Sequence, residues 1–224
     1  MIRILWSVLL CVAAVWFPLA VARVFLDTPI EREMGTVQKI FYFHVPMAWC
    51  MMLAAIVSGV AAAVQLLRNS RRAEALSLAA GEVVLVTGLC VLLTGPIWGH
   101  ATWGTPWTWD ARQVSTALLF LVFCAFVLLR TQGAAGTERL AAGLAAFGAL
   151  DVPVIYYAVK VWKTTHPTTD VVGTLPPSMW RTLFFALAPI AACVAGLVAV
   201  RYHVERAEQQ LDDLFLARSD PASS

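Results

Sequence analysis

Six long apolar stretches alternate with short polar segments along the chain. The apolar stretches cover about 4–26, 41–67, 75–97, 114–129, 140–161 and 180–200. A helix that crosses the hydrocarbon core of a bilayer needs about 20 predominantly apolar residues, which is close to these lengths. The pattern predicts an all-α, polytopic integral membrane protein. Its six transmembrane helices would form a single membrane domain, residues 1–224, with a polar cytoplasmic tail at 206–224.

The composition agrees with insertion into a membrane. Hydrophobic residues make up 60% of the sequence and charged residues 13%, whereas soluble domains carry about 25% charged residues. A net charge of +2 without a basic block argues against nucleic acid as a partner. The cysteines lie singly in apolar stretches, which favours buried apolar side chains over a disulfide framework or a zinc site. They are Cys11, Cys50, Cys90, Cys124 and Cys193.

The first apolar stretch admits two interpretations. Ala20-Val21-Ala22 resembles the A-x-A cleavage site of a signal peptide. The stretch is nevertheless longer than the usual apolar region of such a peptide and is long enough to span. We expect a retained helix and keep cleavage as the alternative.

Arginines mark one side of the predicted bundle. Cytoplasmic loops of membrane proteins carry an excess of Lys and Arg, and the opposite connections here mix basic with acidic residues. We therefore expect both termini in the cytoplasm and the connection between the third and fourth spans at the outer face. The residues that set this orientation are Arg3, Arg68, Arg71, Arg72, Arg130, Arg139, Arg201 and Arg206.

A tryptophan-rich segment, WGHATWGTPWTWDAR, occupies residues 98–112 between the third and fourth spans. Interfacial anchoring needs one or two tryptophans at a helix end, and ordinary aromatic belts decorate both interfaces. Here seven of the nine tryptophans fall on the predicted outer side: Trp49, Trp98, Trp103, Trp107, Trp109, Trp162 and Trp180. We expect the segment to form one connecting loop that presents a flat aromatic surface to a large planar ligand, an unusually rich belt being the alternative.

Two of the four histidines share this outer setting. His44 lies at the outer end of the second span and His166 in the loop between the fifth and sixth. Neutral imidazole is an axial ligand of haem iron, so the pair could bind opposite faces of a haem. Taken singly, His44 could be an interfacial residue beside Pro46, and His166 a plain loop residue. His203 falls on the other side, and the role of His100 is open.

Two acidic residues, Glu82 and Asp151, lie inside predicted spans. Intramembrane carboxylates are costly and often functional. Because the sequence shows no basic residue at a matching depth, we expect protonated or hydrogen-bonded acids at helix contacts.

The motif Trp103-Gly-x-x-Trp107-x-Trp109-Asp110 resembles the WGxxWxWD signature of haem-handling proteins of bacterial cytochrome c maturation. TGPIWG before it, WDAR after it, F-H-V-P around His44 and V-W-K-T-T-H around His166 resemble the haem exporter protein C family most closely. The resemblance covers essentially the whole chain. Larger cytochrome c synthases share the tryptophan signature but carry more spans. His100 departs from the family pattern.

The resemblance implies a role that is neither hydrolytic nor redox, and thus not enzymatic. Such proteins bind haem b at the periplasmic face of the inner membrane and load it onto a membrane-anchored haem chaperone. Their partners are ATP-binding-cassette transporter subunits, a small membrane protein and membrane lipid. By resemblance, His44 and His166 would be the axial ligands. The haem-binding surface would comprise Trp98, Trp103, Gly104, Trp107, Trp109, Asp110 and Arg112.

Haem also carries two propionates, which need cations. Arg112 is the nearest candidate, with Lys39, Lys160, Lys163 and Arg181 behind it. Two alternatives remain open. A membrane cytochrome would carry electrons on haem between intramembrane histidines, and a permease subunit of a transporter would conduct a substrate past Glu82 and Asp151.

Overall fold

The computed structural model describes residues 2–134, 136–162 and 175–219. They fold into long helices and short connections, with no named strand in these ranges. The helices are α1 (Ile2–Ala22), α2 (Phe41–Arg68), α3 (Arg71–Trp103), α4 (Ala111–Gln132), α5 (Glu138–Val161) and α7 (Pro177–Ser219). A π-helical turn, η1 (Arg23–Asp27), and a 3-10 turn, η2 (Thr36–Ile40), lie between α1 and α2.

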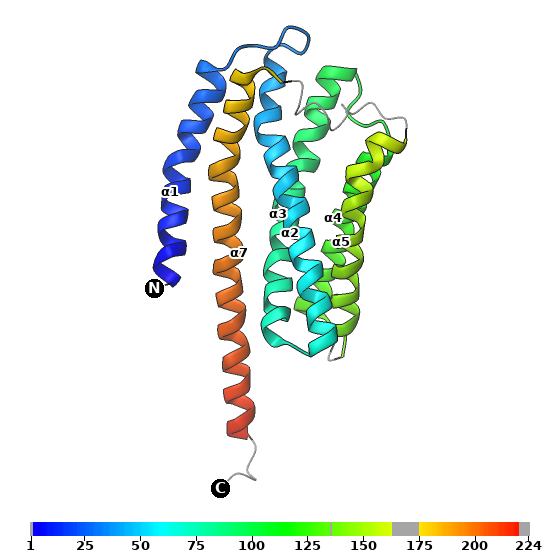
Figure 1. Ribbon diagram of the computed structural model, residues 1–224. Coiled ribbons are helices and arrows are strands. Elements are labelled where there is room, and N and C mark those ends of the chain that lie inside the picture. The colour runs from blue at the N-terminus through cyan, green and yellow to red at the C-terminus, as the bar shows by residue number, and fades with distance from the viewer. Residues whose placement is uncertain (1, 135, 163–174, 220–224) are drawn as a thin grey trace.

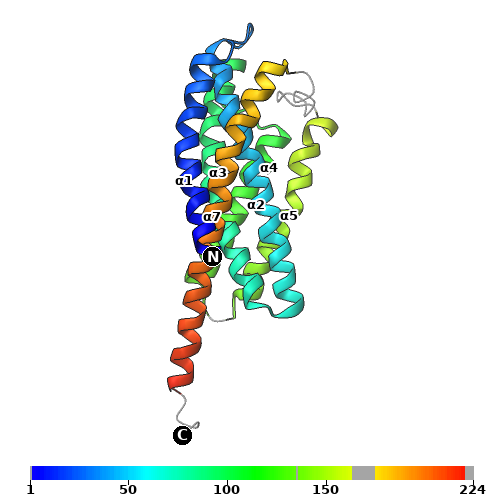
Figure 2. The ribbon, with the colours of Figure 1, turned by 60° about the vertical axis from the view of Figure 1, so that its left-hand side comes forward.

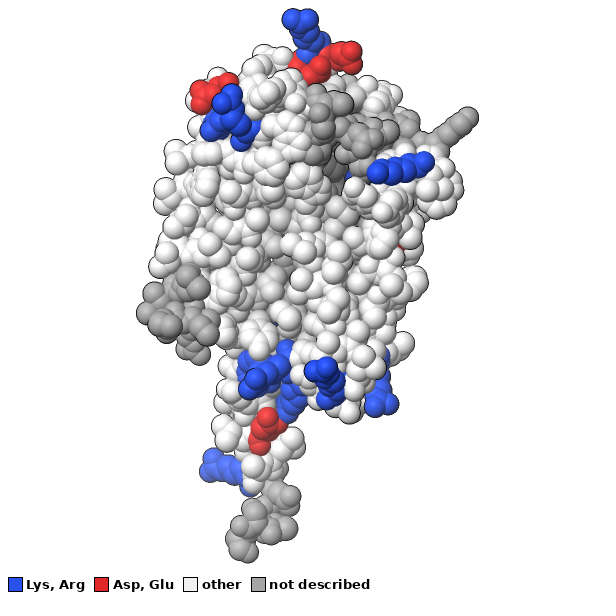
Figure 3. Space-filling model, in the orientation of Figure 1, with Lys and Arg blue, Asp and Glu red and all other residues white. Residues whose placement is uncertain are grey.

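Within the described residues, six helices are long and apolar enough to cross a membrane, which confirms the predicted all-α membrane class. They run side by side in one bundle (Figure 1). We call the end with the α1–α2 and α3–α4 connections the tryptophan end, and the end with the α2–α3 turn the arginine end. Between the two ends, the face in Figure 3 shows a broad band without charged side chains.

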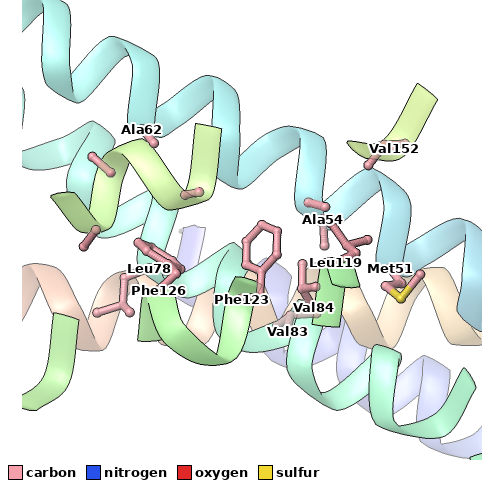
Figure 4. Packing of buried hydrophobic residues seen from close by; sticks show 14 of the residues in the cluster. Met51, Ala54, Ala62, Leu78, Val83, Val84, Leu119, Phe123, Phe126 and Val152 are labelled. Carbon is pink, nitrogen blue, oxygen red and sulfur yellow. The ribbon is translucent and has the colours of Figure 1, made fainter. Parts of the chain in front are cut away.

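The central core lies among α2, α3, α4 and α5. Fifteen buried residues form it, and Figure 4 shows the rings of Phe123 and Phe126 between the surrounding helices. Small residues let α2 and α5 approach closely, since a Cβ at Gly59 would overlap Ala149. Such small contacts are typical of helix packing in membranes. α1 lies apart from this core, against α7 (Figure 1).

Two helices end later than the hydropathy pattern indicated. α3 continues past 97 to Trp103, where Gly104 takes the left-handed conformation (φ +75°) that ends many helices. α7 continues past 200 to Ser219 and extends beyond the rest of the bundle (Figure 2). Good helix formers such as Glu, Gln, Leu and Ala dominate this extension, and it lacks Gly and Pro. The described part of the polar tail is therefore a helix.

Candidate functional site

Helices α2 and α3 place an imidazole and an indole side by side at the tryptophan end. The ring centroids of His44 and Trp98 lie 5.7 Å apart at an interplanar angle of 67°. Trp98 also packs edge-on against Phe41, at 6.0 Å, and is only 8% exposed. Trp98 therefore forms a buried wall beside the His44 ring, and it is part of the core cluster that α1, α2, α3 and α7 share at this end.

Two further residues of α3 contact the His44 ring. The Nδ1 atom of His44 lies 2.8 Å from the hydroxyl oxygen of Thr94. A Cβ on Gly95 would lie 3.3 Å from the Cε1 atom of His44, so the absence of a side chain there admits the ring. The contact of Thr94 with His44 was not foreseen from the sequence. A signal was available, because Thr94 precedes Trp98 by four residues and so shares its helix face.

The tryptophan-rich segment is not the single loop that the sequence suggested. Trp98 and Trp103 belong to the last turns of α3, and Arg112 to the first turn of α4. Only residues 104–110 connect the two helices. α3 runs through Pro96.

The remaining tryptophans line this short connection. Trp103 lies along Gly99, where an added Cβ would be 3.2 Å from the indole ring. Trp107 and Trp109 pack edge to face with centroids 5.7 Å apart. Trp109 has a left-handed backbone (φ 57°) and is 78% exposed. Among these four tryptophans, Trp109 is the exposed one. Its ring lies at 80° to that of Trp107, so these two rings do not form the flat surface that was expected.

Asp110 fixes the connection to α4. Its Oδ1 atom accepts the backbone N–H of Gln113 at 3.0 Å, as an N-cap does, and its Oδ2 atom accepts the hydroxyl of Thr108 at 3.1 Å. The side-chain oxygen of Gln113 accepts the backbone N–H of Thr108 at 2.8 Å. Asp110 and Gln113 thus hold the chain that carries Trp107 and Trp109. Gln113 was not foreseen from the sequence.

The candidate cations for the propionates lie in different environments. Arg112 is half-buried in the first turn of α4, beside Asp110. Lys39 is 5% exposed, and its Nζ atom donates to the backbone carbonyls of Val24 at 2.8 Å and Phe25 at 2.9 Å. Lys39 therefore caps η1, whereas the sequence suggested it as a cation for a propionate. Lys160 lies over the Tyr156 ring.

Arg181 lines a shallow aromatic groove between α1 and α7, together with Trp16, Arg23, Trp180, Phe184 and Phe185. Lys163 and His166 fall outside the described residues. His100 is exposed on α3. His203 lies on α7 beside Tyr202, with ring centroids 5.4 Å apart.

The two intramembrane acids differ. Glu82 does have a basic partner, contrary to the expectation, because Nε of Arg201 on α7 lies 2.6 Å from its Oε2 atom. The long sixth helix carries Arg201 to this depth. Asp151 is 9% exposed, and its Oδ2 atom has no hydrogen-bond partner among the described residues.

The described ranges contain no group of three or more His, Cys, Asp or Glu side chains placed to hold an ion. A single imidazole beside aromatic rings suits a metal that arrives with ligands of its own, as in a metalloporphyrin.

Comparisons with known proteins point to one family. A model of the family described as heme exporter protein C matches residues 1–214. The chain is 30% identical to heme exporter protein C of Bradyrhizobium diazoefficiens over 178 residues, which cover 79% of this chain and 67% of that protein.

Two further relatives carry the same name. The protein of Escherichia coli (strain K12) is 29% identical over 202 residues, which cover 85% of this chain and 81% of the relative. That of Haemophilus influenzae is 30% identical over 190 residues, which cover 79% and 74%. The match over nearly the whole length, the six long apolar helices and the WGxxWxWD motif all agree. The chain belongs to the haem exporter protein C family.

Proposed function

We propose that this protein binds haem b at its tryptophan end, at the periplasmic face of a bacterial inner membrane. It passes the haem to a membrane-anchored haem chaperone of cytochrome c maturation. The observation that carries the proposal is the His44 imidazole, which contacts Thr94 and Trp98 of α3, the helix that leads into the tryptophans of residues 103–109. The proteins to which the chain is related are named haem exporters.

The chemistry of the site suits haem. Aromatic rings bury the apolar porphyrin face well, and iron accepts a neutral imidazole. His44 is the axial ligand on one face, and His166 is assigned to the other from the V-W-K-T-T-H motif. Arg112 is the cation for a propionate.

Unsatisfied donors support a polar ligand here. The indole nitrogens of Trp98 and Trp107 are buried and have no hydrogen-bond partner among the described residues. Buried donors are nearly always hydrogen-bonded in native proteins. A propionate oxygen or a haem-bound group supplies an acceptor without any change of fold.

The role is binding, orientation and release. Trp109 is exposed at the membrane edge, where a partner can reach the site. The positive-inside rule puts this edge in the periplasm. The haem chaperone is the receiving partner. ATP-binding-cassette transporter subunits and a small membrane protein complete the assembly. The protein assists covalent attachment of haem to the chaperone and carries out no other chemistry.

The test is purification with and without the co-expressed chaperone, measuring bound haem, absorption spectrum and covalent chaperone loading. We expect a low-spin, six-coordinate haem whose amount falls when the chaperone is present. His44→Ala and His166→Ala should each leave five-coordinate or exchangeable haem. If both variants kept the six-coordinate spectrum, the ligand assignment would be wrong.

The same preparation separates the two alternatives. A membrane cytochrome would undergo reversible redox cycling in the cell and would keep its haem when the chaperone is present. A permease subunit would move haem or another substrate into vesicles in the absence of the chaperone. Either result, together with no chaperone loading, would overturn the proposal.

A further inference from the structure

We infer that Thr94 is a positioning residue that fixes the tautomer of His44, with the proton on Nδ1 and the lone pair on Nε2. The inference rests on the proposed role of His44 as an iron ligand. It adds the identity of the coordinating atom, Nε2, and the residue that selects it.

The Thr94 hydroxyl group has one proton and two hydrogen-bond neighbours. The Thr94 hydroxyl oxygen lies 2.7 Å from the backbone carbonyl oxygen of Cys90, one turn earlier in α3. A carbonyl oxygen has no proton to give, so the Thr94 hydroxyl donates in this contact. The same oxygen lies 2.8 Å from Nδ1 of His44. Because a hydroxyl has a single proton, the second bond requires Nδ1–H as the donor.

A neutral imidazole carries one ring proton. With that proton on Nδ1, the in-plane lone pair is on Nε2. A metal binds to this lone pair, so Nε2 is the coordinating atom. Histidine ligands of metals characteristically donate their other N–H to an oxygen, which fixes ring orientation and raises basicity at the ligating atom. Thr94 supplies that oxygen from α3, while His44 belongs to α2.

Two contacts keep the ring in the orientation that the hydroxyl requires. Trp98 borders it at 5.7 Å between centroids, and the missing side chain of Gly95 leaves the space that Cε1 fills. Thr94, Gly95 and Trp98 lie within two turns of α3. The ring is therefore held by α3 through its Nδ1 edge and its contact with Trp98.

The chain offers a matched control. Thr87 lies two turns earlier in the same helix, is 2% exposed, and donates its hydroxyl to the Val83 carbonyl at 2.7 Å. Its hydroxyl makes the same backbone bond as that of Thr94, without a histidine. Thr87→Val therefore reports the cost of removing a helix-bonded hydroxyl and nothing else.

The first experiment uses haem-free protein in lipid nanodiscs. Ring-¹⁵N-labelled histidine reports by NMR which nitrogen carries the proton, and His44 is assigned by loss of its signals in His44→Gln. We expect the Nδ1–H form in the wild type, in Thr94→Ser and in Thr87→Val. Thr94→Val should show a substantial population of the Nε2–H form, because Val fills the space without an acceptor.

The second experiment titrates haem into the same four proteins. Loss of such an outer partner typically weakens metal binding about 10- to 100-fold, and we expect this loss for Thr94→Val. Thr94→Ser should restore both affinity and spectrum, and Thr87→Val should leave both unchanged.

The two experiments can contradict the tautomer inference and the ligand assignment separately. An Nε2–H form of His44 in the haem-free wild type would overturn the inference, whatever the protein does with haem. The same holds if Thr94→Ser fails to behave as the wild type while Thr87→Val does. If the Nδ1–H form is found but His44→Gln keeps six-coordinate haem, the tautomer stands and the ligand assignment of the proposed function fails. The wild-type measurement is decisive even if Thr94→Val does not fold.

Discussion

Arg201 of α7 and Glu82 of α3 form an ion pair, with Nε 2.6 Å from Oε2. The guanidinium also contacts Glu205 at 3.1 Å, one turn further along α7. The pair joins the sixth helix to the core of the bundle. Glu82 is thus a structural contact, which weakens the idea that it lines a substrate path.

Replacing Glu82 by Gln should lower thermal stability without changing the haem spectrum. Loss of one partner of a fully buried pair costs about 3–5 kcal/mol. The two side chains here are 26% and 28% exposed, and Arg201 keeps Glu205. We therefore expect a smaller cost, about 1–2 kcal/mol, seen as a lower Tm in detergent. Glu208→Gln is the control, since Glu208 is 57% exposed and should change little. Equal Tm losses would contradict this account.

Removal of the Trp98 side chain should lower stability, whereas removal of the Trp109 side chain should not. Trp98 is 8% exposed, and its replacement by Ala should cost about 3–5 kcal/mol of stability. Trp109 is 78% exposed, so Trp109→Ala should keep the wild-type Tm. If haem covers Trp109, that variant should weaken haem binding by up to about 2 kcal/mol, roughly 30-fold. Unchanged haem affinity in Trp109→Ala would remove it from the binding surface.

Asp110 should act through the connection that it caps. Asp110→Ala should destabilise the protein by about 1 kcal/mol, because the N-cap acceptor is lost. Asp110→Asn keeps an acceptor for the Gln113 N–H and should cost less. We expect both variants to retain six-coordinate haem but to load the chaperone less well, measured as covalently bound haem. Loss of the six-coordinate spectrum in Asp110→Asn alone would show a direct role at the iron.

Substitution of Lys39 should lower stability, whereas substitution of Arg112 should mainly weaken haem binding. Lys39→Met removes the donor that satisfies the Val24 and Phe25 carbonyls, so Tm should fall. Haem affinity of the folded fraction should not change. Arg112→Gln should weaken haem affinity more than it lowers Tm. Haem titration and thermal melting of both variants test this. Weaker haem affinity in Lys39→Met and a lower Tm alone in Arg112→Gln would assign the ligand-binding role to Lys39 and the structural role to Arg112.

The orientation of the bundle is testable by labelling. In a cysteine-free background, a cysteine at Thr105 should react with an impermeant maleimide added to spheroplasts. A cysteine at Ala134, which is exposed in the α4–α5 turn at the arginine end, should react only after lysis. The opposite result would invert the predicted topology.

The sequence alone determined the class of the protein and the identity of its aromatic segment. Membrane spans are predictable because transfer of a helix into a bilayer depends on the summed hydropathy of consecutive residues. Helix ends also depend on the residues nearby in the sequence, as Gly104 at the end of α3 and Asp110 at the start of α4 show. The WGxxWxWD motif is local too, and it led to the family without knowledge of the fold.

The tertiary structure alone decided which side chains meet. Thr94 is 50 residues from His44, and Arg201 is 119 residues from Glu82. Lys39 was a candidate cation, behind Arg112, until its contacts with η1 were known. Such pairings depend on the rotation and depth of each helix. In a membrane, all faces of a helix are apolar, so the hydropathy pattern carries little information about rotation. Close packing of small residues, such as Gly59 against α5, sets it instead.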